Sequence, residues 1–263
     1  MDSHSMLRLS LFIGIFGVMA LAEALWPARQ AVVNKALRWR ANLAMVVCGA
    51  LVGRVVLPAS VAGVALWAQQ HSIGVLHHIA IPGWLSVVLA VLWLDLVIYW
   101  QHRLFHRIPL LWQLHKVHHA DSHVDTTTGL RFHPLEIGLS LLVKSAAVLL
   151  LGAPAVAVLI FEVALNGFAL FNHSNIRLPQ ALDDKLGRLI ITQRLHRIHH
   201  SQYGRETNSN YGFSVSWWDR LFNSFTHRAE QTDEQLDIGL TAYPATPANS
   251  RFVRLLMMPF RRS

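Results

Sequence analysis

The stretch GWLSVVLAVLWLDLVIYWQHRLFH, residues 83–106, decides the fold expected for this chain. Its first part, residues 83–100, contains a single charged side chain, Asp95. A helix of this length, at about 1.5 Å per residue, nearly crosses a hydrocarbon core of about 30 Å. His102 and His106 follow directly, and positions i and i+4 share one face of a helix. The stretch therefore predicts a membrane-spanning helix with two imidazoles at one end.

Apolar runs before this stretch predict two further spans. Residues 6–25 form the first run and residues 43–67 the second, which is interrupted by Arg54 and Pro58 and is therefore expected to be kinked. The first run also fits a cleavable signal peptide. The basic residues that follow it favour a retained span whose C-terminal end faces the cytoplasm; they are Arg29, Lys35, Arg38 and Arg40.

An apolar run after the stretch is too long for one crossing. As a single helix, residues 135–171 would measure about 55 Å, nearly twice the hydrocarbon core. The sequence Leu-Gly-Ala-Pro at residues 151–154 is a break signal inside this run. We therefore expect a helical hairpin, residues 137–150 and 155–171, which either crosses twice or turns inside the bilayer.

The overall composition supports a membrane protein. Of the 263 residues, 53% are hydrophobic and 14% are charged, whereas soluble domains carry roughly a quarter charged residues. In such a chain the net charge of +8 indicates cytoplasmic flanks and contact with lipid headgroups, not nucleic acid. The single cysteine, Cys48, excludes an internal disulfide. Residues 68–82 carry no Lys, Arg, Asp or Glu, which places them on the side of the membrane opposite to His102 and His106.

These features predict an all-α integral membrane bundle of three spans plus a helical hairpin, with a cytoplasmic histidine-rich helical cap. Residues 1–82 are expected to form N-terminal membrane spans. Residues 83–229 are expected to form the catalytic domain, and residues 230–263 a C-terminal cytoplasmic tail.

Histidine is unusually frequent, with sixteen residues against fifteen carboxylates. The pattern HxxHH occurs twice, at residues 115–119 and 196–200. On a helix its first and last members share a face, while the middle member is offset by about 100°. One triad can therefore contact two neighbouring metal ions. Imidazole suits Zn, Cu, Fe and Ni, so histidine alone does not select the metal.

The order of these motifs resembles the fatty acid hydroxylase/sterol desaturase superfamily of membrane di-iron enzymes. The resemblance extends from about Asp95 to Phe222. It includes the sequences RFHPLE at 131–136, NHSN at 172–175, NYG at 210–212 and WDRLF at 218–222. It implies two iron ions and the following ligands: His102, His106, His115, His118, His119, His133, His173, His196, His199 and His200. For His133, a helix cap or a supporting role remained an alternative.

Metal-bound imidazoles usually donate their other N–H to a carboxylate or a carbonyl. Four carboxylates lie close enough in sequence to be candidates for this role. Solvated charges and helix caps are the ordinary alternatives for each of them. The candidates are Asp95, Asp121, Glu136 and Asp219.

The resemblance implies an oxygenase that uses O2 and external electrons to hydroxylate or desaturate a fatty acyl, sterol or related lipid. The sequence has no GxGxxG or CxxCH motif, so we expect electrons from NAD(P)H through a ferredoxin or a b-type cytochrome with its reductase. Basic residues near the motifs either dock this donor or anchor the cytoplasmic side. They are Arg103, Arg107, Lys116, Arg194 and Arg197.

Two other classes of protein stay open at this point. A histidine-lined metal transporter would place its ligands near the midplane of several spans, and a haem electron carrier would hold its haem between two imidazoles. The resemblance to compact bacterial members favours a multi-pass enzyme of the bacterial inner membrane, with its active site on the cytoplasmic side.

Overall fold

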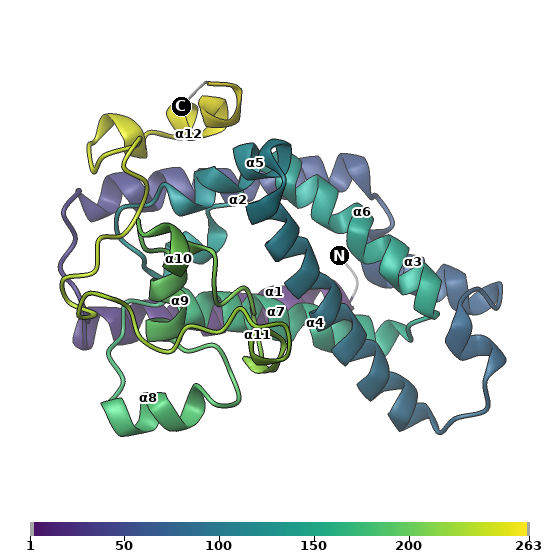
Figure 1. Cartoon of the computed structure of the whole chain (residues 1–263). Coiled ribbons are helices and arrows are strands. Elements are labelled where there is room, and N and C mark those ends of the chain that lie inside the picture. The colour runs from purple at the N-terminus through teal and green to yellow at the C-terminus, as the bar shows by residue number, and fades with distance from the viewer. Residues whose placement is uncertain (1–2, 262–263) are drawn as a thin grey trace.

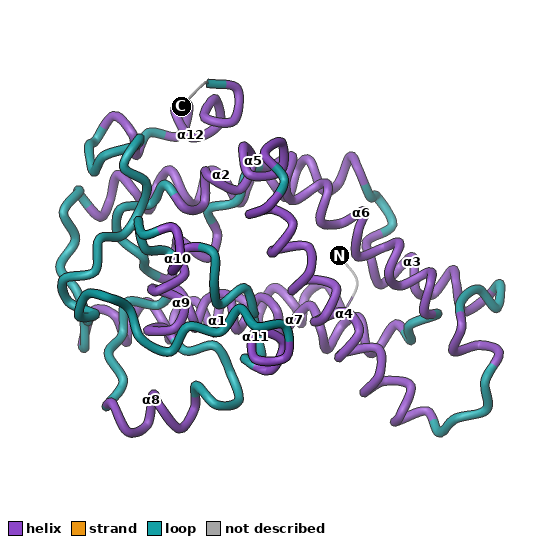
Figure 2. The backbone as a smooth tube through the Cα atoms, in the orientation of Figure 1, coloured by secondary structure: helices purple, strands orange, loops and turns teal. Residues whose placement is uncertain are grey.

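The computed structural model describes residues 3–261, which form helices joined by loops, with isolated bridges and no strand in that range (Figures 1 and 2). Five segments are long and apolar enough to cross a membrane. This confirms the predicted membrane bundle of three spans and a hairpin. The long helices are α1 (Ser3–Leu25), α2 (Lys35–Val56), α4 (Gly83–Arg107), α6 (Pro134–Leu151) and α7 (Ala155–His173).

The predicted kink in the second span lies between α2 and α3 (Ser60–Gln70). Pro58 occupies this break, where it has no N–H to donate and cannot continue the hydrogen bonding of α2. The second candidate span includes both helices and η1 (Val75–His78). Leu43, Val47 and Leu51 form an exposed apolar stripe along α2, which marks its lipid-facing side.

The hairpin breaks where the sequence predicts. Gly152 ends α6 in the left-handed conformation, at φ 74°, which glycine adopts without steric cost. The close approach of Gly74 to this turn leaves no room for a side chain, since an added Cβ would lie 2.1 Å from the Gly152 nitrogen. The helices contain 18 and 19 residues, so each is about 27 to 29 Å long and matches the hydrocarbon core. Both therefore have the length for a full crossing.

One apolar core joins the spanning helices. Val61 and Ala65 of α3, Leu94 of α4, and Val158 and Phe161 of α7 are buried together in it. Because α4 and α7 both run toward the same end of the bundle, their last turns present His102, His106 and His173 there.

Shorter helices cover this end of the bundle (Figure 1). Residues 230–261, which belong to the expected tail, pack against the bundle. Tyr243, Leu255 and Met258 are buried in one cluster with Met45 of α2 and Val117 of α5 (Pro109–His119). The short elements are α5 (Pro109–His119), η2 (Thr126–Leu130), α8 (Gln180–Leu186), α9 (Gln193–His199), α10 (Gly204–Thr207), α11 (Trp217–Leu221), η3 (Ala248–Ser250), α12 (Phe252–Met257) and η4 (Met258–Phe260).

Candidate metal centre

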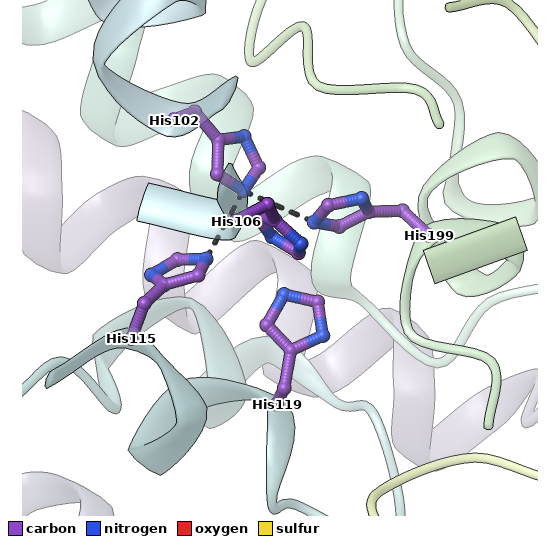
Figure 3. A group of neighbouring side chains, drawn as sticks. All are labelled: His102, His106, His115, His119 and His199. Carbon is purple, nitrogen blue, oxygen red and sulfur yellow. Dashed lines mark hydrogen bonds between the residues drawn. The ribbon is translucent and has the colours of Figure 1, made fainter. Parts of the chain in front are cut away.

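Nine of the ten predicted histidine ligands converge in two groups at this end of the bundle. Within each group, one side-chain nitrogen from every residue lies within 4.8 Å of the others. The groups are adjacent, since the His119 and His200 ring centroids, one from each, are 4.5 Å apart. The first group is His102, His106, His115, His119 and His199 (Figure 3), and the second is His118, His173, His196 and His200.

The helical spacing explains why each HxxHH triad contributes to both groups. On α5, the first and last members, His115 and His119, belong to the first group and the middle member, His118, to the second. The triad that begins on α9 is reversed, because its middle member, His199, belongs to the first group. Two triads with offset middle members therefore interlock and hold the groups side by side.

Nitrogen atoms face one another at short distances in the first group. Nε2 of His102 lies 3.1 Å from Nε2 of His115 and 3.0 Å from Nε2 of His199. These contacts join α4, α5 and α9, and Figure 3 shows the rings directed at a common point.

The second group has the same kind of contact. Nε2 of His173 lies 3.1 Å from Nε2 of His118 and 2.8 Å from Nε2 of His196. Nε2 of His200 is 3.2 Å from that of His196. His173, the last residue of α7, therefore completes a group whose other members come from the two triads.

The hydrogen bonds on the far side of the rings fix which nitrogen faces inward with a free lone pair. Nδ1 of His102 donates to the Tyr211 carbonyl oxygen and Nδ1 of His199 to the Ser209 carbonyl oxygen, both at 2.7 Å. A neutral imidazole has one N–H, so Nε2 of each ring carries a lone pair. Two lone pairs at 3.0 Å repel unless a cation lies between them. The donor set therefore fits a bound metal ion.

Buried nitrogens without protein partners support the same fit. Within residues 3–261, Nε2 of His106 and His119 and Nδ1 of His118, His196 and His200 are buried and have no hydrogen-bond partner. Buried polar groups are normally satisfied, so each such nitrogen indicates a ligand or an ordered water. Imidazole ligands are compatible with iron, zinc, copper or nickel.

The groups are electrically suited to bind a cation. Burial, together with neighbouring imidazoles, holds the pKa values of His118, His119, His196, His199 and His200 well below their ordinary value. Because these rings are neutral at pH 7, their lone pairs are free to coordinate a metal.

His133 lies apart from both groups. It precedes α6, where its Nδ1 accepts the Leu135 N–H at 3.2 Å as a helix cap. Its Nε2 is 3.1 Å from the Leu256 carbonyl oxygen, to which it donates. This position does not support a ligand role for His133, because both ring nitrogens are used in backbone contacts. It agrees instead with the cap alternative.

Two of the four predicted carboxylates help to position imidazoles of the two groups. Oε1 of Glu136 accepts a hydrogen bond from Nδ1 of His115 at 2.7 Å. Asp219 acts indirectly, because it accepts the Tyr211 and Gly212 N–H groups at 2.8 Å and so fixes the loop whose carbonyl orients His102. Burial raises the pKa of Asp219 to about 6, although hydrogen bonds from Ser224 and the loop oppose this shift.

The other two carboxylates have different partners. Oδ2 of Asp95 accepts from the Trp218 indole N–H at 2.8 Å, which ties α4 to α11. Asp121 pairs with Arg38, whose Nε and Nη2 each lie 2.7 Å from one of its oxygens. Although burial opposes ionisation of Asp121, Arg38 and Arg131 hold its pKa well below its usual range.

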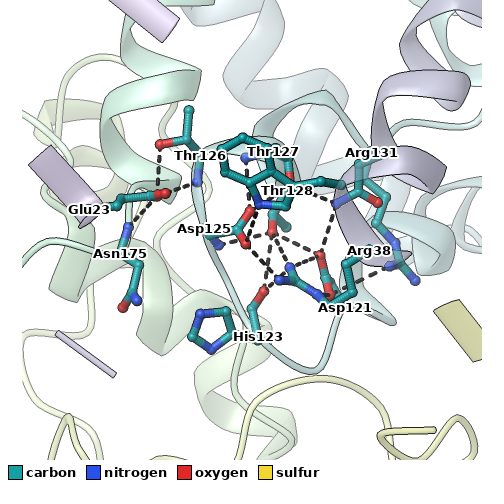
Figure 4. Close-up of polar contacts among 12 residues, drawn as sticks. Glu23, Arg38, Asp121, His123, Asp125, Thr126, Thr127, Thr128, Arg131 and Asn175 are labelled. Carbon is teal, nitrogen blue, oxygen red and sulfur yellow. Dashed lines mark hydrogen bonds and ion pairs between the residues drawn. The ribbon is translucent and has the colours of Figure 1, made fainter. Parts of the chain in front are cut away.

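The Arg38 network was not predicted, because Arg38 was interpreted only as a topology signal. Its buried guanidinium also contacts Asp125 at 2.6 Å (Figure 4). Arg131 donates from Nε to the Val117 carbonyl oxygen at 2.9 Å. The network thus joins α2 to the loop after His119. The signal in the sequence is the pair of carboxylates, Asp121 and Asp125, immediately after an HxxHH triad.

Glu23, at the end of α1, was also missed. Its Oε1 accepts the Thr126 N–H at 2.5 Å and the Asn175 N–H at 2.7 Å (Figure 4). Asn175 lies two residues after His173. Glu23 therefore links α1 both to the loop that follows α5 and to the chain that leaves the second group.

Two of the five basic residues that were expected either to dock the electron donor or to anchor the cytoplasmic side are buried. Lys116 donates from Nζ to the Arg261 carbonyl oxygen at 3.2 Å, and Arg197 pairs with Asp233 at 2.6 Å. Neither side chain is available to an external protein.

The fold and the site define a membrane-embedded helical bundle that gathers histidines into two adjacent groups, each of which could hold a metal ion. The family model for fatty acid hydroxylase matches residues 87–224. The chain therefore belongs to the fatty acid hydroxylase family. The matched residues include all nine clustered histidines.

Three relatives illustrate the range of the family. The chain is 30% identical to the ornithine lipid hydroxylase OlsE of Rhizobium tropici, over 67% of this chain and 51% of that protein. It is 26% identical to human alkylglycerol monooxygenase, over 60% and 33%. It is 29% identical to mouse lathosterol oxidase, over 55% and 48%. The chain thus spans about half or less of the length of these relatives. No solved structure matches it significantly.

Proposed function

We propose that this chain is a membrane-bound di-iron oxygenase that uses O2 and external electrons to hydroxylate or desaturate a lipid. The observation that carries the proposal is the pair of interlocked imidazole groups, which offers ligands for two neighbouring ions. Relatives named hydroxylase, monooxygenase and oxidase support the same class of reaction.

The nine clustered histidines would hold the iron ions. Bound iron would supply the activation of O2 and the removal of hydrogen from an unactivated C–H bond. The protein holds the imidazoles in place through Glu136 and the carbonyls of Tyr211 and Ser209. Phe132 stacks on His118 with ring centroids 4.3 Å apart, so the second group is flanked by an apolar ring that excludes water.

A membrane lipid is the proposed substrate. The names of the relatives specify an ornithine lipid, an alkylglycerol and lathosterol, which differ in headgroup and share a lipid character. His102, His106 and His173 lie at the ends of α4 and α7, so this part of the site is close to a lipid in the adjacent leaflet. Ornithine lipid is the first substrate to test, because its hydroxylase aligns with the largest share of this chain among the three relatives described.

Topology suggests where the reaction takes place. Lys35, Arg40 and Arg107 are exposed at the histidine end of the bundle, which by the positive-inside rule faces the cytoplasm. We therefore propose a bacterial inner-membrane enzyme that receives electrons from NAD(P)H through a ferredoxin, or through a b-type cytochrome, with its reductase.

The position of the histidines argues against metal transport. A transport site lies near the bilayer midplane, where it alternates between the two sides. Here His102 and His106 occupy the last turns of α4, and His173 is the last residue of α7. Ligands at one end of the spans suit chemistry at the interface better than passage across it. The nine rings also exceed the two axial ligands that a single haem would use.

The proposal is tested with full-length protein in nanodiscs, loaded with ferrous iron and supplied with a reductase system and a bacterial lipid extract. We expect O2 consumption and a lipid that gains one oxygen atom or loses two hydrogens, detected by mass spectrometry. His118→Ala should abolish the product, whereas His227→Ala, an exposed histidine outside both groups, should retain it. Equal product from both variants would refute the proposal.

A further inference from the structure

The last described segment, residues 251–261, has the sequence RFVRLLMMPFR and carries positive charge only. This segment has three arginines, and no Asp or Glu occurs after Asp237. By contrast, residues 172–250, which include most of the cap over the histidines, contain eight Lys or Arg and eight Asp or Glu. The C-terminal segment is therefore better suited than residues 172–250 to contact an anionic surface.

The segment is amphipathic. Leu255 and Met258 are buried against α2 and α5. Val253, Met257 and Phe260 are 67%, 42% and 64% exposed, and their spacing of i, i+4 and i+7 places them along one side. A stripe of three large apolar side chains thus faces away from the protein, with Arg251 and Arg254 on the same short helix or next to it.

Backbone contacts hold this stripe in a fixed orientation. Nζ of Lys116, which lies between two α5 histidines in the sequence, donates to the Arg261 carbonyl oxygen at 3.2 Å. Nε2 of His133 is 3.1 Å from the Leu256 carbonyl oxygen. Both hydrogen bonds fix the buried side of the segment to the protein, so the exposed stripe cannot turn inward unless they break.

The stripe lies at the depth of the membrane interface. α12 packs on α2 (Figure 1), and its Leu255 is buried in one cluster with Ala41 and Met45 of that helix. In this part of α2 the exposed basic residue Arg40 is followed by the exposed apolar residue Leu43. A change from basic to apolar side chains along a spanning helix marks the boundary between headgroups and acyl chains. Leu110, at the start of α5, is also exposed, and α5 contacts η4.

We propose that residues 251–261 lie in the headgroup layer of the leaflet at the histidine end and bind anionic phospholipid. Arg251 and Arg254 contact the phosphates, and the three apolar side chains reach the acyl chains. Amphipathic segments with these two features bind at interfaces through buried apolar area and attraction to anionic lipid. Because the segment also packs against α5, this contact braces the helix that carries His115, His118 and His119.

Spin labels in the full-length protein test the proposal. In a Cys48→Ala background, labels are attached to Val253→Cys, to Val47→Cys on the lipid-facing stripe of α2, and to Ala245→Cys, an exposed site outside the segment. Collision rates with O2, which concentrates in acyl chains, and with a water-soluble nickel complex report depth. The measurement uses nanodiscs of phosphatidylcholine alone and nanodiscs that also contain phosphatidylglycerol.

We expect the label at position 253 to collide with O2 more often than the label at 245 and to lie less deep in the membrane than the label at 47. Phosphatidylglycerol should deepen the label at 253, and Arg251→Gln with Arg254→Gln should remove this effect without changing the label at 47. A label at 253 as accessible to nickel as the one at 245 would overturn the proposal. Exclusion of both reagents from the label at 253 would also overturn the proposal, because it would indicate cover by a second copy. A depth of this label that does not change when phosphatidylglycerol is added would overturn it as well.

Discussion

Nε2 of His102 lies 3.0 Å from Nε2 of His199, although 97 positions separate the two residues in the sequence. Their opposite ring nitrogens donate to the backbone carbonyls of Tyr211 and Ser209, which belong to one loop. A spanning helix and a helix of the cap therefore present two lone pairs to the same point. This relationship depends on tertiary structure and gives the cluster a donor set that fits a metal ion.

The hydrogen bond from His115 to Glu136 should be needed for firm metal binding. Glu136→Gln keeps the size of the side chain but replaces a charged acceptor with a neutral amide. Supporting partners of this kind typically change metal affinity or activity by about 10- to 100-fold. We expect weaker iron binding in a competition with a chelator. The control is Glu234→Gln, which changes an exposed pair with Arg177 and should leave iron affinity unchanged; equal affinities in both variants would count against the role of Glu136.

His133 and His196 should behave differently when replaced by alanine. His196 faces His173 at 2.8 Å within the second group, so its loss should lower the iron content. His133 makes backbone contacts outside both groups, so His133→Ala should lower the thermal midpoint and retain iron. Elemental analysis of the purified variants distinguishes these outcomes. If His133→Ala loses iron and His196→Ala retains it, the ligand role that the sequence suggested for His133 is restored.

Arg38 should be essential for stability. Arg38→Met leaves Asp121 and Asp125 buried without their main cationic partner. Removing one member of a buried ion pair typically costs about 3–5 kcal/mol. We expect a large fall in the thermal midpoint measured in detergent. Arg40→Met, at an exposed position on the same helix, should change stability by less than about 0.5 kcal/mol. Similar midpoints for the two variants would show that the network adds little.

His123 should contribute to acid sensitivity. Burial, followed by the charge of Arg38, lowers its pKa from 6.5 to about 4. The unfolded chain therefore takes up a proton before the folded chain does, and stability falls as the pH decreases from 6.5 toward 4. One pKa unit corresponds to about 1.4 kcal/mol, so the full loss is of the order of a few kcal/mol.

His123→Gln removes this group and should reduce the drop in thermal midpoint between about pH 7 and about pH 5. His227→Gln, at an exposed histidine, should leave the drop unchanged. The prediction fails if both variants lose as much stability on acidification as the unmodified protein.

The spans and the two histidine groups were accessible from the sequence because they depend on local patterns. The Leu-Gly-Ala-Pro sequence located the hairpin break at residues 151–154, and the HxxHH spacing indicated that each triad can serve two metal ions. The role of Arg38 was not accessible, since a basic residue beside a span has the same appearance whether it faces headgroups or two buried carboxylates. His133 was ambiguous for a local reason, because a histidine before Pro134 is equally compatible with a ligand and a helix cap.

The packing of the C-terminal segment could not be predicted either. Residues 251–261 are short and rich in both arginine and apolar residues, which suits a surface tail as well as an interfacial helix. The burial of Leu255 and Met258 against α2 and α5 is the observation that distinguishes a packed segment from a free surface tail.

The iron content of the full-length protein tests the central claim most directly. After loading with ferrous iron and removal of loosely bound metal, elemental analysis and Mössbauer spectroscopy should show two iron ions per chain in histidine-rich sites close to one another. His196→Ala should reduce this content and His227→Ala should not. One iron per chain, or two ions with no magnetic interaction after oxidation, would contradict a dinuclear centre formed by the interlocked triads.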